Sequence, residues 1–173
     1  LGGIALLVRA AYHVRGEPAL TNNGVDLQIA GRAVLMHPGV CVPLGGKALL
    51  DYAGRLAFPE LAILWTFQEA GWDGVWLDSY RRKFRTGYWD QAPLTSIPDA
   101  PTGLLARISE RTKAAWNGRW DVLCWKNGHV LFAESKRVGR DTIRESQRTW
   151  LAAALDLGLE PTNFLVVEWA LIG

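Results

Sequence analysis

The chain has 173 residues, of which 49% are hydrophobic and 21% are charged, and this composition excludes a disordered or fibrous protein. Its 19 basic and 17 acidic residues give a net charge of +2, so no strong overall field directs it to nucleic acid. No apolar stretch is long enough for a membrane span, and two cysteines, Cys41 and Cys124, favour a reducing compartment over a disulfide framework. We expect a cytoplasmic protein.

The first part of the chain predicts an extension, a helix and a strand. Residues 1–57 mix apolar stretches with turn sequences, and we expect an N-terminal extension packed on the core. Pro59 opens an apolar segment that Gly71 closes, which predicts a helix over residues 59–70. Residues 74–80 then predict a strand.

The middle of the chain, at about residues 86–117, has the features of an insertion or a flap. Three prolines fall within residues 88–102, which predicts a long loop. A polar helix is expected from about Leu104 to Ala115.

The last third of the chain has the most regular pattern. It predicts strands over 120–126 and 129–138, a helix over 142–157 and a final strand over 163–170. The capping box Thr142-Ile-Arg-Glu145 is expected to start the helix. One polar residue, Gln147, interrupts the apolar stripe of this helix, and its amide needs a partner either among the site residues described next or in the core backbone.

The two strands are joined by Asn127-Gly128, which favours a two-residue hairpin turn and fixes their register. In that register Asp121 lies directly opposite Glu134, on the same face as the apolar residues of the hairpin. Like charges placed opposite each other destabilise a sheet, so we expect a compensating group. Lys136, two residues beyond Glu134, adds a positive charge on that face.

A divalent cation is the natural compensating group, because Mg²⁺ binds carboxylate oxygens together with water and phosphate. Lys136 beside it could orient a water molecule or stabilise charge that develops on phosphate. The plainer alternative is a surface hairpin with an Asp–Lys ion pair and a solvated glutamate, which explains the residue types but not the apolar alternation.

These residues resemble the PD-(D/E)xK nuclease superfamily, with Asp121 followed by the element Glu134-Ser135-Lys136. The predicted order of helices and strands agrees with the αβββαβ core of that superfamily. Within it, the later sequence Ser146-Gln-Arg-Thr-Trp-Leu151 and Leu157-Gly158 is similar to the VRR-NUC branch, the virus-type replication and repair nucleases. The resemblance covers about residues 58–170.

The resemblance implies an α/β fold with a restriction-endonuclease-like core, in which helices flank a central mixed sheet, over residues 58–173. It implies that Asp121, Glu134 and the carbonyl of Ser135 hold Mg²⁺ or Mn²⁺, and that Lys136 is the catalytic lysine. Glu60, in the first turn of the first helix, matches a glutamate that often completes the site. An acid is also favoured there by the helix dipole alone.

Two departures from the family are visible. Trp120 stands where a proline often precedes the motif aspartate, although that proline is loosely kept. The insertion at about residues 86–117 has no counterpart in the resemblance. It could shape the choice of substrate.

Two basic clusters border the expected site and are candidates for contact with the phosphate backbone of DNA. They comprise Arg81, Arg82, Lys83 and Arg85 in one segment and Arg137, Arg140, Arg144 and Arg148 in the other. Solvated charged faces are the plainer explanation of such runs.

The function expected from all of this is a metal-dependent DNA endonuclease, with structure-specific cleavage in replication, repair or recombination as one form of it. The alternative is a catalytically inactive DNA- or protein-binding module on the same scaffold. A structural domain or an enzyme of another class would require a different hairpin register. The sequence leaves a homodimer open.

Overall fold

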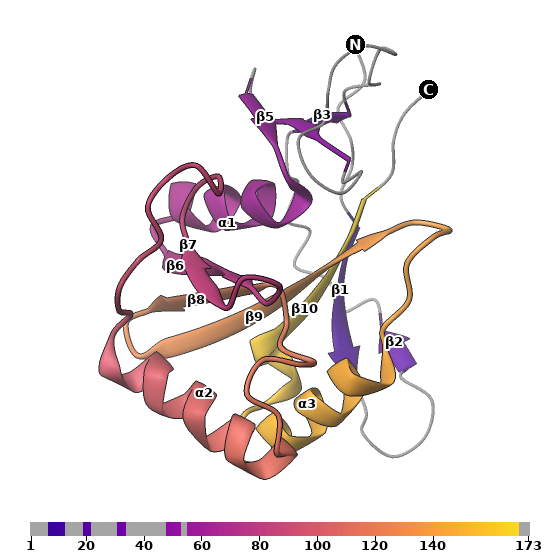
Figure 1. Ribbon diagram of the computed structural model, residues 1–173. Coiled ribbons are helices and arrows are strands. Elements are labelled where there is room, and N and C mark those ends of the chain that lie inside the picture. The colour runs from indigo at the N-terminus through magenta and orange to yellow at the C-terminus, as the bar shows by residue number, and fades with distance from the viewer. Residues whose placement is uncertain (1–6, 13–18, 22–30, 34–47, 53–54, 170–173) are drawn as a thin grey trace.

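The computed structural model describes residues 7–12, 19–21, 31–33, 48–52 and 55–169. Most of the predicted N-terminal extension therefore lies outside the described residues. Figure 1 shows a central sheet with helices on both faces, so the α/β class expected from the sequence is confirmed.

Five strands of a mixed sheet follow the order β10-β9-β8-β6-β7, with β7 at one edge, and two N-terminal strands, β1 and β2, extend the sheet beyond β10. Among the strands that the structure describes, β9 and β10 alone pair in parallel, because helix α3 carries the chain back between them. The strands are β1 Leu7–Tyr12, β2 Ala19–Thr21, β6 Asp73–Asp78, β7 Lys83–Arg85, β8 Val122–Lys126, β9 His129–Arg137 and β10 Phe164–Trp169. A separate three-stranded sheet contains β3 Gly31–Ala33, β4 Leu50–Tyr52 and β5 Arg55–Ala57.

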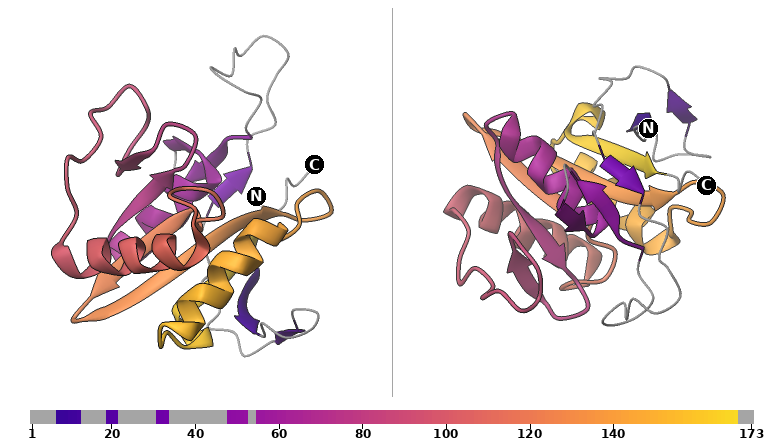
Figure 2. Two further views of the ribbon diagram at one scale, coloured as in Figure 1. Left: turned by 60° about the horizontal axis from the view of Figure 1, so that its bottom comes forward. Right: turned by 90° about the horizontal axis from the view of Figure 1, so that it is seen from above.

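The helices cover the two faces of the central sheet unequally (Figures 1 and 2). Helix α1, Pro59–Glu69, packs on one face, where the buried side chains include Leu61, Val122 and Ala133. Helices α2, Asp99–Thr112, and α3, Glu145–Asp156, cover the other face and pack together. A single turn of 3-10 helix, Pro161–Asn163, precedes β10. Among the described residues no helix combines the length and apolarity that a membrane crossing requires.

Helix α1 begins and ends as the sequence predicts, with Pro59 at its first position and Gly71 just beyond it at φ +77°. Helix α2 differs from its prediction, since it begins at Asp99 and not near Leu104. Pro101 lies in the first turn of α2, where a backbone N–H has no partner within the helix, so the proline does not delay the start.

The predicted start of the last helix is wrong. Helix α3 begins at Glu145, and Arg144 before it has extended backbone at φ −76° and ψ 156°, so Thr142 does not cap the helix. The turn ahead of the helix is held instead by Asp141, whose Oδ2 accepts a hydrogen bond from the Arg137 N–H at 2.8 Å.

Strand β7 was not predicted from the sequence. The basic cluster that follows β6 turns back to form β7, in which Trp76 pairs with Arg85 and Asp78 with Lys83. Arg85 is only 6% exposed, because its Nε donates to Asp78 Oδ2 at 2.9 Å. Of the four basic residues expected to face DNA here, this one instead braces the fold.

Candidate active site

The turn between β8 and β9 has the predicted geometry, with positive φ at both Asn127 and Gly128. The strands pair from Lys126–His129 to Val122–Ala133, so the next position places Asp121 opposite Glu134. The Asp121 N–H donates to Glu134 Oε2 at 3.2 Å. The expected register is confirmed, and a register that separates the two acids is excluded.

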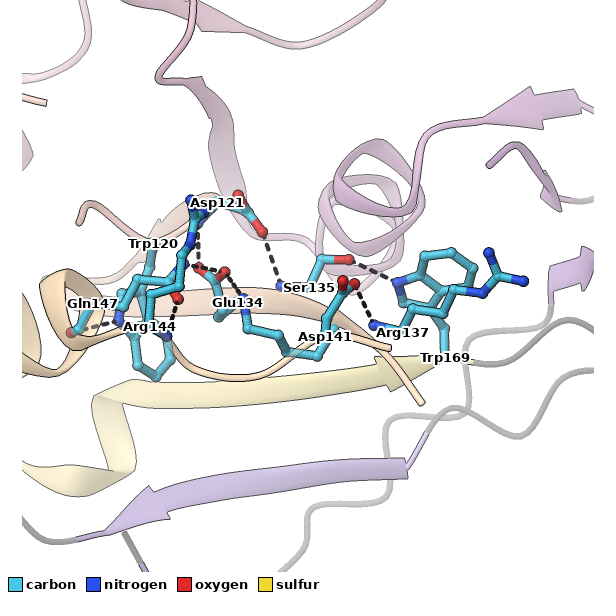
Figure 3. A network of polar contacts seen from close by, with 10 residues as sticks. Trp120, Asp121, Glu134, Ser135, Arg137, Asp141, Arg144, Gln147 and Trp169 are labelled. Carbon is cyan, nitrogen blue, oxygen red and sulfur yellow. Dashed lines mark hydrogen bonds and ion pairs between the residues drawn. The ribbon is translucent and has the colours of Figure 1, made fainter. Parts of the chain in front are cut away.

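The two carboxylates lie where β8 begins and β9 approaches its end, so they are close to the ends of two inner strands of the sheet (Figure 3). Asp121 Oδ2 accepts a hydrogen bond from the Ser135 N–H at 3.0 Å, which fixes its side chain. Glu134 is 1% exposed, and its Oε1 accepts from both Lys136 Nζ and Gln147 Nε2. The alternative with a solvated glutamate is therefore wrong.

Gln147 is buried and joins the site in the way the apolar stripe of α3 suggests. Its amide nitrogen donates to Glu134, and its Oε1 accepts the Arg144 N–H at 2.9 Å. The side chain thus satisfies an N–H group ahead of the helix and a carboxylate on β9 at once. The sequence left two partners open for the Gln147 amide, a site residue or the core backbone. The structure shows the site residue Glu134 as the partner of the amide nitrogen.

Burial raises the pKa of both acids. The pKa of Asp121 lies well above its usual value, first because burial disfavours the carboxylate and then because the charges of Glu134 and Glu60 repel it. Burial also raises the pKa of Glu134, although Lys136 and Gln147 oppose the rise. Both acids are therefore protonated more readily than ordinary carboxyl groups, and a bound cation would relieve the repulsion of Asp121 by Glu134 and Glu60.

The site opens into a cavity of about 480 Å³. Glu60 from α1, Asp121 from the residue before β8, and Glu134 and Lys136 from β9 line this cavity, together with Ser135, Arg140, Asp141, Thr142 and Arg144. The first turn of α1 contributes Glu60, which is 7% exposed. The three acids and the lysine expected from the sequence thus line one space.

A smaller cavity of about 280 Å³ is lined by four of the same residues, Glu60, Ser135, Arg140 and Asp141. Trp169 and Arg137 also line it, together with Ala48 and Pro59, and the Arg137 guanidinium lies 5.5 Å from the centre of the Trp169 ring. The Trp169 Nε1 also donates to Ser135 Oγ at 3.0 Å. Sequence reasoning missed Asp141 and Trp169, since neither belongs to a motif.

The basic residues expected to contact DNA are placed differently from one another. Arg140 and Arg144 are exposed and line the larger cavity, whereas Arg137 reaches only the smaller one. Arg148 is partly buried on α3 and lines neither cavity. In the other cluster Arg81, Arg82 and Lys83 lie at and beside the turn between β6 and β7 and are not among the residues that line either cavity.

The oxygen donors of the larger cavity suit a hard cation such as Mg²⁺ or Mn²⁺, and such an ion would reduce the repulsion of Asp121 by Glu134 and Glu60. Across residues 48–52 and 55–169, however, no three His, Cys, Asp or Glu side chains already stand close enough together to hold an ion. Asp121 and Glu134 are the two acids in direct contact, through the Asp121 N–H.

Comparisons of the chain with protein-family models, with curated proteins and with solved structures find no match.

Gly118 holds the loop before Asp121 against the start of α3. It adopts φ +81°, and a Cβ there would lie 2.2 Å from the Ser146 carbonyl oxygen. We expect Gly118→Ala to destabilise the fold by about 1–3 kcal/mol beyond the cost of the left-handed backbone, because the overlap is with backbone atoms.

Gly139→Ala is the matched control, since Gly139 has φ +72° and no atom within 4 Å of a built Cβ. It should show only the backbone cost of about 1–2 kcal/mol. Urea unfolding of both variants measures the difference, and equal midpoints would contradict the close approach at Gly118.

Proposed function

We propose that this chain is a divalent-metal-dependent nuclease that hydrolyses phosphodiester bonds in DNA. The observation that carries the proposal is the convergence of three buried or half-buried acids, Glu60, Asp121 and Glu134, on one cavity beside Lys136. Acids, a lysine and two exposed arginines in one cavity suit a substrate that is a phosphodiester and not a neutral molecule.

The order of elements supports the resemblance to the PD-(D/E)xK superfamily and its VRR-NUC branch. Helix α1, strands β6, β8 and β9, helix α3 and strand β10 follow the order αβββαβ, with β7 and α2 inserted between the first and second of those strands. A restriction-endonuclease-like core is part of this proposal.

Asp121 and Glu134 would hold the metal, with Glu60 and the Ser135 carbonyl as further oxygen donors. When bound, Mg²⁺ or Mn²⁺ would polarise a phosphate oxygen and lower the pKa of a bound water. Gln147 and the Asp121 N–H keep the Glu134 carboxylate in place, and the Ser135 N–H does the same for Asp121.

The remaining residues act on the substrate. Lys136 supplies a buried positive charge beside the site of reaction, where it would stabilise negative charge that develops on the phosphate. Arg140 and Arg144 would hold neighbouring phosphates at the exposed side of the cavity.

The first test is metal binding and cleavage by the full chain. We expect it to nick supercoiled plasmid with Mg²⁺ or Mn²⁺ and to be inactive in EDTA. Calorimetric titration with Mn²⁺ should give a binding heat that Asp121→Asn removes, because that variant loses a ligand charge. Asp141→Asn is the control, since Asp141 lines the same cavity but serves to accept the Arg137 N–H, and it should keep the heat.

The second candidate is an inactive module that only binds DNA or protein. It is favoured by the contacts that already engage Glu134, whose two oxygens accept three hydrogen bonds from Lys136, Gln147 and Asp121. A wild-type chain that shows no Mn²⁺ heat and no cleavage would support this candidate against the nuclease.

A further inference from the structure

The turn between β6 and β7 presents an unusual side chain to solvent. Tyr80 is 90% exposed, more than any other large hydrophobic side chain in the part of the chain that the structure describes. Leu56, Leu94 and Val138, the other exposed members of this class, are between 40% and 56% exposed. Because this ring lies outside the core, it contributes little to folding and is accessible to a binding partner.

The turn that carries Tyr80 is braced from below. The buried Asp78 carboxylate accepts the Arg81 N–H at 3.2 Å and the Arg85 Nε at 2.9 Å. The Arg81 guanidinium lies 5.5 Å from the ring centres of both Tyr80 and Trp89. The ring is therefore supported by a held arginine, which reduces the entropy that binding would cost.

The charge around Tyr80 is positive. Arg81 is 31% exposed, and Arg82 and Lys83 are exposed. Asp78, the acid that pairs with this turn, is 3% exposed and already engages both Arg81 and Arg85. An exposed aromatic ring among cations fits a nucleic acid better than an apolar protein surface, because bases stack on the ring while phosphates meet the charges.

The turn is also close to the candidate active site. The Leu77 N–H donates to the Asp121 carbonyl at 2.7 Å, so the end of β6 is bonded directly to the residue proposed to bind metal. Tyr80 follows Leu77 by three residues, and three extended residues span at most about 11 Å. A strand of DNA bound at the cavity would therefore pass near this turn.

We propose that Tyr80 stacks on an unpaired base beside the cleaved phosphate, so that the protein prefers DNA containing single-stranded regions to intact duplex. The inference rests on the proposed nuclease function for its choice of substrate. In an intact duplex each base is covered on both faces by its neighbours, so the ring can reach a base face only in a single strand, at a fork or at an end. Arg82 and Lys83 contact phosphates and add affinity for either form of DNA.

Binding measured in EDTA tests the inference without any cleavage. The probes are a fluorescently labelled single-stranded oligonucleotide, the same sequence as a hairpin-closed duplex without free ends, and a single strand containing 2-aminopurine. We expect Tyr80→Ala to weaken binding of the single strand about tenfold or more while changing duplex binding less than twofold. Tyr80→Phe should retain the affinity, and wild type but not Tyr80→Ala should quench the 2-aminopurine fluorescence.

Lys83→Ala is the matched control, since it removes an exposed charge from the same hairpin. It should weaken both forms of DNA alike and reduce the dependence of binding on salt. Equal effects of Tyr80→Ala on both forms, or none, would overturn the inference, as would failure of the wild type to bind either DNA, which would point to a protein partner.

Cleavage assays separate this inference from the proposed function. A chain that binds single strands through Tyr80 but cleaves nothing would uphold the stacking surface and refute the nuclease. A chain that cleaves plasmid, but in which Tyr80→Ala affects the binding of single-stranded and duplex DNA equally, would uphold the nuclease and refute the stacking surface. The melting temperature of Tyr80→Ala should equal that of the wild type, because the side chain is exposed.

Discussion

Asp121→Asn is expected to abolish metal-dependent cleavage and, in the same protein, to stabilise the metal-free fold. The first effect follows from the loss of a charged ligand, and we expect a fall in the cleavage rate of about 10³-fold or more, which corresponds to roughly 4 kcal/mol of transition-state stabilisation. The second effect follows from removing a carboxylate whose pKa is raised by burial and by its acidic neighbours. Asparagine keeps the oxygen that accepts the Ser135 N–H.

The stabilisation should depend on pH with a defined sign. An acid whose pKa is higher in the folded state than in the unfolded state destabilises the fold as pH rises above the unfolded value, because the unfolded chain then holds fewer protons. Below an ordinary aspartate pKa of about 4 both states are protonated and the variant gains nothing. At pH 7–8 in EDTA we expect a gain of about 1 kcal/mol, or roughly 2–4 °C in Tm.

Thermal unfolding with and without Mg²⁺ makes the experiment decisive. Wild type should gain stability when the ion is added, and Asp121→Asn should not. The control is Asp156→Asn, which changes an acid whose side chain is 65% exposed and should alter neither cleavage nor the response of Tm to Mg²⁺. A lower Tm for Asp121→Asn in EDTA at pH 7–8 would contradict the strained pair of acids described above.

The parts of the site that could be predicted from the sequence are those fixed by local rules. Asn127-Gly128 determines a turn, the turn determines a register, and the register alone brings Asp121 to Glu134. The placement of Lys136 follows from alternation along one strand. Helix α1 could be predicted because proline and glycine mark its two ends.

The parts that could not be predicted depend on contacts between distant elements. Trp169 reaches Ser135 only because β10 pairs in parallel with β9, and no local signal contains that pairing. The burial of Arg85 depends on its ion pair with Asp78 on the neighbouring strand. Because the sequence does not show that pairing, it does not distinguish Arg85 from the exposed basic residues beside it. The capping box failed for a similar reason, because Asp141 stabilises a turn where the helix was expected to begin.

The pair formed by Glu134 and Lys136 should prove costly to break, and this changes how the proposed role of Glu134 in cleavage is best tested. Glu134 is 1% exposed and Lys136 is 6% exposed, so removing either partner leaves a buried charge without its counter-ion. We expect Lys136→Met to destabilise the fold by about 3–5 kcal/mol. Glu134→Ala would carry a comparable cost, so its loss of cleavage would not by itself identify a catalytic role.

The double variant Glu134→Gln with Lys136→Met removes both charges and keeps an oxygen for Gln147, so it should recover most of that loss. Arg111→Met is the control for an ion pair at the surface, since Arg111 and Asp156 are 4.0 Å apart with side chains 55% and 65% exposed. It should cost at most about 1 kcal/mol. Urea unfolding measures all three, and a Lys136→Met variant no less stable than Arg111→Met would show that the buried pair does not form. If Lys136→Met proves the less stable of the two, the pair forms in the wild type. A double variant that then folds well yet cleaves nothing separates the chemistry of these side chains from their contribution to folding.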